Sequence, residues 1–83
     1  MTRIAKLYDR ARTNPRGLSF REFERLLGAF GFVHERTVGS HRHYAHPSVP
    51  DVLTAVPDGK EVKPYLVRRF LAMVDEFGLD VTE

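Results

Sequence analysis

One short segment of the chain concentrates residues that can carry out acid–base chemistry. Positions 38–44 read VGSHRHY. In an extended strand, side chains alternate between two faces, so His41 and His43 point one way and the serine, arginine and tyrosine the other. Imidazole has the unperturbed pKa nearest neutrality, so such a pair can move protons at cellular pH, here favouring chemistry on a phosphodiester. The alternative is a solvated strand whose histidines take no part in chemistry, and the short spacing alone leaves both interpretations open.

The composition is that of one small domain without disulfides. The chain has 83 residues, of which 42% are hydrophobic, a fraction too high for a disordered tail. It contains no cysteine, which excludes a disulfide framework and a thiolate metal site. No apolar run approaches the roughly 20 residues that span a bilayer. We therefore expect a cytoplasmic protein with no membrane partner.

The net charge of +2 is unevenly distributed along the chain. Residues 1–46 carry nine Lys and Arg against four acids, whereas residues 47–83 carry four against seven. Because the basic half holds the histidine segment, this distribution suits a polyanion as partner. The alternative is that arginine on exposed helix faces only aids solubility.

Three helices and three strands are expected. Helical spacing of apolar residues predicts a short helix over 3–12, a second over about 20–30 and a last one over 64–77. Ser19 and Glu22 form a capping box, in which the serine oxygen caps the first turn and the glutamate reaches back.

The strands are expected between the second and the last helix. They are predicted over 32–37, 40–46 and 51–56, with a turn at Val38-Gly39 and a loop over 48–50. The resulting order is α-α-β-β-β-α. Three antiparallel strands with helices on one face form a two-layer α+β sandwich.

Several short motifs occur in a fixed order along the chain. They are FGF at 30–32, GSHRHY at 39–44, HP at 46–47, VP at 56–57 and GKEVKP at 59–64. In this order and at these spacings, they resemble the HicA family of toxins, small mRNA interferases of type II toxin–antitoxin systems. The resemblance implies a single HicA-like domain over 1–83, with a family core over 18–77 and a helical extension over 1–17.

The resemblance also implies a fold, an activity and a partner. The fold is like that of a double-stranded-RNA-binding domain, with a three-stranded antiparallel sheet covered by helices on one face. The family's catalytic histidine is the one in Gly-Ser-His, which falls on His41. The implied activity is cleavage of mRNA with relaxed sequence preference, without a cofactor, and the implied partner is a HicB-type antitoxin that covers the active site.

Metal-independent cleavage of RNA needs a base for the 2′-hydroxyl, an acid for the leaving oxygen and a cation for the developing charge. His43, two positions after His41, is the candidate for an assisting proton role, although a surface neighbour is the simpler interpretation. Arg36 and Arg42 are the nearest guanidinium groups for phosphate. If Arg42 lies on the face opposite His41, Arg36 is the better candidate.

Other residues of these motifs are candidates for RNA contact. Ser40 belongs to the histidine segment, and Lys60 and Lys63 precede the last helix, whose N-terminus attracts anions. Helix-entry lysines on the surface are an equal alternative. Tyr44 can stack on a base, but an aromatic residue on the helix-facing side of a sheet more often belongs to the core.

Three further interpretations remain at this point. A zinc site on His41, His43 and His46 is the least favoured interpretation, because no carboxylate or cysteine lies close in sequence to complete the set of ligands. His34 and His46 are expected to be structural. A non-catalytic RNA-binding module and a purely protein-binding domain are the competing functions, and salt dependence of binding separates them.

Overall fold

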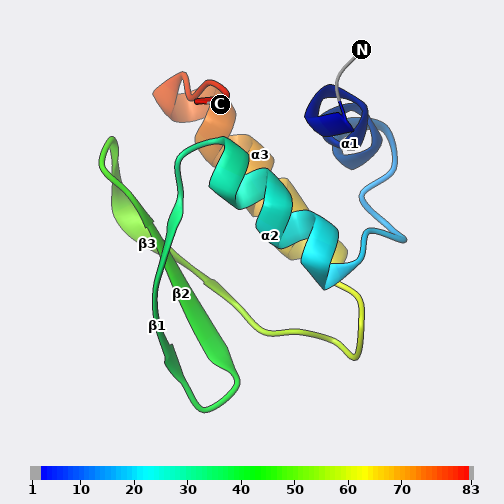
Figure 1. Cartoon of the computed structure of the whole chain (residues 1–83). Helices are drawn as coiled ribbons and strands as arrows, with labels where there is room; N and C mark the ends of the chain where they lie inside the picture. Colours follow the sequence, from blue (N-terminus) through cyan, green and yellow to red (C-terminus); the bar gives the residue numbers. More distant parts are fainter. Residues whose placement is uncertain (1–2, 83) are drawn as a thin grey trace.

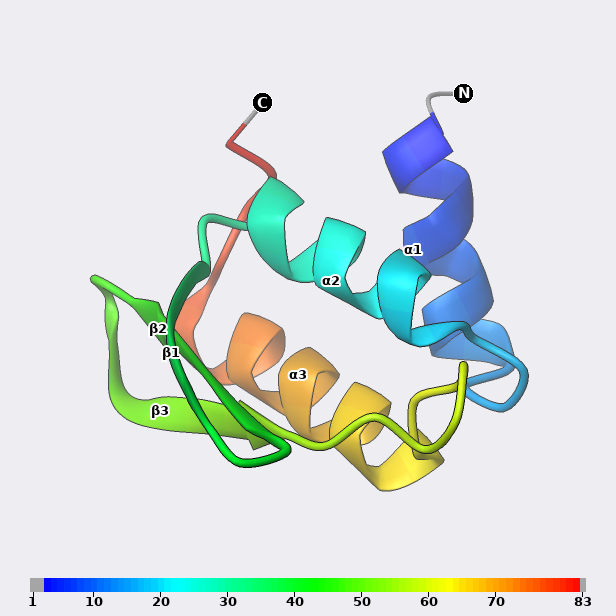
Figure 2. The ribbon, with the colours of Figure 1, turned by 60° about the horizontal axis from the view of Figure 1, so that its bottom comes forward.

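The computed structural model describes residues 3–82, which form a layer of helices against one antiparallel sheet (Figure 1). The elements are α1 (Arg3–Thr13), α2 (Phe20–Ala29), β1 (Val33–Val38), β2 (His41–His46), β3 (Val49–Ala55) and α3 (Pro64–Phe77). The strands lie in the order β1-β2-β3, with both pairs antiparallel. All labelled helices lie on one side of the sheet in both views (Figure 2). The predicted α+β class and the order α-α-β-β-β-α are confirmed.

Local chemistry sets the ends of α2 and α3. The Ser19 hydroxyl accepts the Glu22 backbone N–H at 3.0 Å, and the Glu22 carboxylate accepts the Ser19 N–H at 2.9 Å, so the predicted capping box is present. Pro64 occupies the first turn of α3, where its missing N–H is not needed. Gly78 ends α3 in the left-handed conformation, with φ of 61°.

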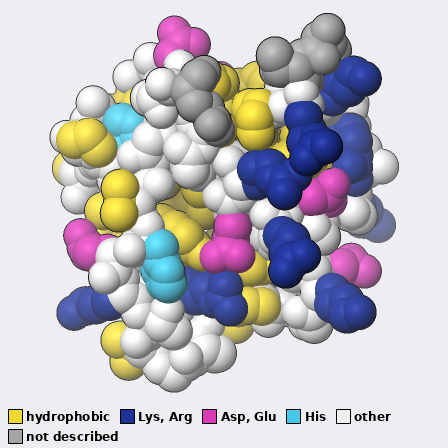
Figure 3. Space-filling model, viewed as in Figure 1, with side chains coloured by type: hydrophobic (Ala, Val, Ile, Leu, Met, Phe, Trp, Pro, Cys, Tyr) yellow, Lys and Arg dark blue, Asp and Glu magenta, His cyan; other side chains and the backbone are white. Residues whose placement is uncertain are grey.

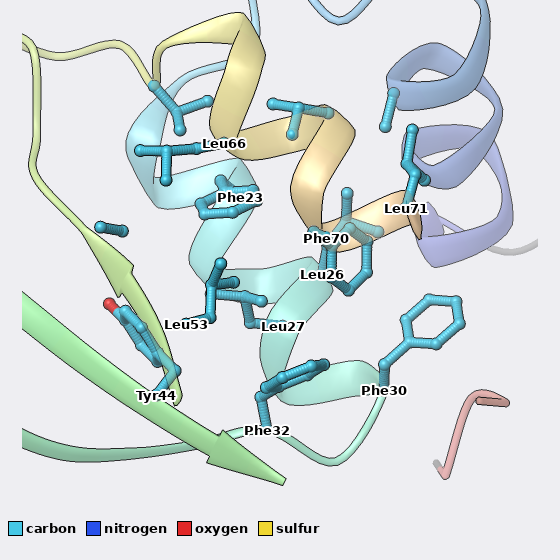
Figure 4. Packing of buried hydrophobic residues seen from close by; sticks show 14 of the residues in the cluster. Phe23, Leu26, Leu27, Phe30, Phe32, Tyr44, Leu53, Leu66, Phe70 and Leu71 are labelled. Atoms are coloured by element: carbon cyan, nitrogen blue, oxygen red, sulfur yellow. The ribbon is translucent and has the colours of Figure 1, made fainter. Parts of the chain in front are cut away.

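The core lies between α2, α3 and the inner face of the sheet (Figure 4). Phe70 of α3 is fully buried, and its ring meets Phe23, Phe30 and Phe32 at centroid distances of 6.0, 5.3 and 6.0 Å. The planes of the paired rings meet at 62–87°, which is the edge-to-face arrangement that aromatic rings favour. Leu53 of β3 is also fully buried. The packing fixes which face of the sheet is covered and which is left open.

α1 packs on α2 and α3, on the side of the helical layer away from the sheet (Figures 1 and 2). Leu7 is buried against the core, and the Tyr8 ring lies 5.2 Å from the Phe30 ring. Arg12 donates from Nη1 to Asp75 Oδ2 of α3 at 3.0 Å. Contacts to both other helices therefore hold α1 in place.

A two-residue turn joins β1 to β2. Gly39 and Ser40 form the turn, and Val38 pairs with His41 across it. Gly39 has φ of 61°, as the first central residue of a type II′ turn does. The predicted turn at Val38-Gly39 and the predicted strand start at Ser40 are therefore each one residue too early, because the positive-φ glycine takes the first position of the turn.

β3 begins earlier than the sequence predicts. The expected loop over 48–50 is wrong from Val49 onward, because Val49 pairs with His46 and is 7% exposed. Pro50 lies inside the strand. β3 is an edge strand, where a residue without an N–H need not interrupt the ladder. The strand also ends one residue before the predicted end at Val56.

Candidate functional site

The side of the sheet away from the helices, which we call the open face, carries both histidines of the 38–44 segment. Directly paired residues of antiparallel strands project from the same face. His41 pairs with Val38, and His43 pairs with Arg36 on one side and Thr54 on the other. The residues next to them on β2 and β3 face the helices, and all of these except the half-buried Arg42 are buried. These five residues therefore define the open face.

His41 is exposed at the first position of β2, directly after the two-residue turn. Its position beside a tight turn leaves the imidazole at the end of the sheet, where a long polymer can approach it. Residues two apart in a strand are separated by about 7 Å. His41 and His43 are thus close enough for both to face one bound nucleotide.

His43 is half-buried, and a neighbouring strand orients its ring. The Nδ1 atom of His43 lies 3.0 Å from the Thr54 hydroxyl of β3. Which of the two donates depends on the tautomer of the imidazole. Since this bond engages Nδ1, proton exchange with a ligand falls to Nε2.

The two candidate arginines lie on opposite faces of the sheet. Arg36 is exposed and pairs with His43, so it shares the open face with His41. Arg42 faces the helices, where Nη1 donates to Glu24 Oε2 at 3.0 Å and the guanidinium lies 5.0 Å from the centroid of the Phe20 ring. The structure therefore brings Arg36, and not Arg42, together with the histidine pair.

Tyr44 belongs to the core, and its hydroxyl donates to Glu24 Oε2 at 2.6 Å. Burial, followed by the bond to the Glu24 carboxylate, raises the pKa of Tyr44 above its usual value of 10. The placement of Tyr44 in the core is confirmed. Glu24 is the residue that the sequence reasoning missed; the signal was an acid one turn after Phe20, beside the apolar stripe of α2.

Ser40, Lys60 and Lys63 lie in turns and loops rather than on the open face. Ser40 is exposed in the β1–β2 turn. Lys60 and Lys63 are exposed between β3 and α3, and Lys60 lines a hollow of about 480 Å³ with Ser19 and Arg21. Of the three, Ser40 is the one adjacent to His41, and the lysines border the N-termini of α2 and α3.

The other two histidines contact aromatic rings of the fold, with His34 exposed on β1 and His46 half-buried at the end of β2. The His34 ring lies 5.1 Å from the Tyr44 ring, and its Nε2 lies 2.7 Å from the Thr37 hydroxyl. The His46 ring packs 5.1 Å from the Phe32 ring, and its Nδ1 accepts the Ser48 backbone N–H. Within residues 3–82, no three His, Asp or Glu side chains lie close enough together to hold a metal ion, so His46 does not complete a site with the histidine pair.

Apolar side chains border the histidine pair on the open face. Val33, Val38 and Val52 are 63%, 58% and 40% exposed. Their pairing and alternation place them on the same face as His41. The open face therefore offers apolar as well as polar side chains for contact with another macromolecule.

The fold and the site define a small α+β protein whose sheet presents a histidine pair on an uncovered face. A family model described as the HicA toxin of bacterial toxin–antitoxin systems matches residues 20–74. The chain therefore belongs to the HicA toxin family and is the toxin of a toxin–antitoxin system. Comparisons with curated proteins and with solved structures give no match. Within the described part of the chain, every helix is too short or too polar to cross a membrane.

Proposed function

We propose that this toxin is a metal-independent endoribonuclease that cleaves mRNA and arrests translation, with His41 as general acid or base. The observation that carries the proposal is the position of His41. It is exposed at the start of β2, on the open face, and shares that face with His43 and Arg36. Cleavage of a phosphodiester by the neighbouring hydroxyl needs groups that accept and donate protons, and a cation beside them. The imidazoles and the guanidinium of the open face supply these groups.

The reaction uses the ribose of the substrate as its nucleophile. The 2′-oxygen attacks the adjacent phosphorus, the bond from phosphorus to the 5′-oxygen breaks, and a cyclic phosphate and a free 5′-hydroxyl result. His41 takes the proton of the 2′-hydroxyl or returns one to the leaving 5′-oxygen. His43 supplies the complementary transfer through Nε2. Arg36 binds the phosphate oxygens, where charge develops in the transition state.

The partner that this proposal implies is a HicB-type antitoxin that covers the open face. The exposed valines of the open face, of which Val38 pairs with His41, offer the apolar contact that a stable protein interface requires at its centre. An antitoxin on this face blocks access of RNA to the histidines without changing the toxin's fold. Since the substrate is mRNA, the expected place of action is the cytoplasm.

The test is cleavage of a synthetic RNA by the purified chain and by the His41→Ala variant. We expect the substitution to lower the cleavage rate by about 10²–10⁴-fold, the usual contribution of a positioned acid or base. Circular dichroism and the urea midpoint should stay unchanged, because the His41 side chain is exposed. Addition of a chelator should leave cleavage unchanged.

His34→Ala is the matched control, since it removes an imidazole from the other side of the same sheet. Equal rates for wild type and His41→Ala would place the chemistry on another residue. If the wild type binds RNA but leaves it intact, the chain is a non-catalytic RNA-binding module of the same fold. Loss of cleavage in chelator with rescue by zinc would restore the metal interpretation.

A further inference from the structure

Basic side chains gather over α1 and the adjoining part of α2, far along the chain from the histidine segment. Figure 3 shows Lys and Arg concentrated over these helices. Six residues line a hollow there of about 520 Å³: Arg3, Lys6, Leu7 and Arg10 from α1, and Glu22 and Arg25 from α2. We call this hollow the α1–α2 groove. α1 lies outside residues 20–74, so the groove includes an element that the family model does not cover.

The basic groups of α1 form a row along the groove. Arg3, Lys6 and Arg10 are three and four positions apart, the spacing of neighbours on one helix face. At 1.5 Å per residue, the row extends for about 10 Å. Arg25 adds a fourth cation from the opposite wall. A linear array of cations suits a linear polyanion.

The one acid in the groove does not cancel this charge. Glu22 Oε2 accepts a hydrogen bond from Arg10 Nη1 at 2.9 Å, and its other oxygen accepts the Ser19 backbone N–H. The bond from the Ser19 backbone, which has the larger effect, and the bond from Arg10 both lower the pKa of Glu22. Among the described acids, none forms an ion pair with Arg3, Lys6 or Arg25. The groove therefore keeps three uncompensated positive charges.

The groove is preorganised because both of its walls are fixed. α1 is held by the stacking of Tyr8 on Phe30 and by the ion pair of Arg12 with Asp75. α2 is held by its capping box and by the core. A surface whose helices are already packed does not have to order its backbone when it binds an anion, so it loses less conformational entropy.

We propose that the α1–α2 groove binds the phosphate backbone of RNA, as a second contact surface for the RNA that the open face is proposed to cleave. The identity of the polyanion as RNA rests on that proposed function. An acidic protein is the less suitable ligand, because the groove offers no apolar anchor. Its one apolar side chain, Leu7, is 5% exposed, whereas the exposed valines of the sheet, Val33, Val38 and Val52, lie on the open face.

The two surfaces lie on different sides of the molecule, so one RNA must be long enough to reach both. The longest dimension of the chain is 36 Å. With a rise of about 3.4 Å per stacked nucleotide, about ten nucleotides span that distance. A 20-nucleotide probe is therefore suitable for testing the groove.

The experiment compares the full chain with the double variant Lys6→Gln/Arg25→Gln. Fluorescence anisotropy measures the Kd of a 20-nucleotide RNA that carries 2′-O-methyl groups at every position, over a range of NaCl concentrations. Loss of two phosphate contacts should weaken binding about tenfold at low salt and reduce the slope of log K against log salt by about 1.4. The control variant Arg68→Gln/Arg69→Gln removes two exposed charges from α3 and should change the Kd less than about twofold.

Three outcomes overturn the proposal. The first is an unchanged Kd in the groove variant, and the second is an equal loss of RNA affinity in the groove and control variants. The third is a groove variant that no longer binds polyglutamate but still binds RNA, which would mark the groove as a surface for an acidic protein. Because the methylated probe has no 2′-hydroxyl to react, the measurement reads binding alone. Failure of the proposed nuclease function would appear separately, as absence of His41-dependent cleavage.

Discussion

At the scale of single residues, Glu24 joins the helical layer to the central strand. Its Oε2 atom accepts hydrogen bonds from the Tyr44 hydroxyl and from Arg42 Nη1. Both donors lie on the inner face of β2, in alternation with His41 and His43. The bonds therefore fix the inner face of β2 against α2, and in doing so hold the histidines toward solvent on the other face.

Tyr44→Phe tests this connection through its pH dependence. Below pH 10 the phenol is protonated in the folded and the unfolded chain, and loss of its bond should lower the free energy of unfolding by about 1–2 kcal/mol. Above pH 10 the unfolded chain releases the phenolic proton while the folded chain, whose Tyr44 pKa is raised, keeps it. The wild type should then lose stability relative to the variant, by at most about 1.4 kcal/mol per pH unit.

Urea unfolding of both proteins from pH 7 to 11 measures the difference. It should be constant up to about pH 9 and shrink above pH 10. A difference that stays constant to pH 11 would mean that neither burial nor the bond to Glu24 raises the pKa of Tyr44 in solution.

The sequence predicted part of this arrangement and missed the rest for a physical reason. The period of two along an extended strand is a local property, so it correctly placed Arg42 and Tyr44 on one face and His41 and His43 on the other. Glu24 lies 18 and 20 positions from its two partners. Such a bond depends on how α2 crosses the sheet, which no local pattern specifies.

At the scale of elements, residues with strong local chemistry set the boundaries that the sequence predicted best. Ser19 and Glu22 start α2, and the proline at its first turn starts α3 where expected. The strand ends were less accurate. Val49 and Pro50 suggest a loop by composition, but pairing of Val49 with His46 draws them into β3. That pairing is tertiary, and it outweighs the local preference of proline.

Ser19→Ala tests how much α2 depends on its cap. The variant loses the acceptor for the Glu22 backbone N–H, which should lower the free energy of unfolding by about 1 kcal/mol. Thermal and urea unfolding followed by circular dichroism measure the loss. Ser48→Ala, in the exposed turn before β3, is the control and should change stability by less than about 0.5 kcal/mol. Equal stability of the two variants would show that the Glu22 carboxylate alone is enough to start α2.

At the scale of the whole molecule, one aromatic cluster connects elements that lie far apart in sequence. Phe70 of α3 meets Phe23 of α2 and Phe30 and Phe32 at the connection from α2 to β1. Phe30 also carries the contact to Tyr8 of α1. The family core and the added helix therefore share one hydrophobic core, and we expect them to fold as one cooperative unit.

Phe70→Ala is the sharpest test of that cooperativity. Removing a fully buried phenylalanine should lower the free energy of unfolding by about 3–5 kcal/mol, a large fraction of the roughly 4–12 kcal/mol typical of a chain this size. Far-UV circular dichroism reports the helices, and tyrosine fluorescence reports the surroundings of Tyr8, Tyr44 and Tyr65. Both signals should move to the same lower urea midpoint with an unchanged m-value, whereas Arg69→Ala, exposed on the same helix, should leave the midpoint in place. If the two signals gave different urea midpoints, the chain would not unfold as one cooperative unit and the single-core description would be wrong.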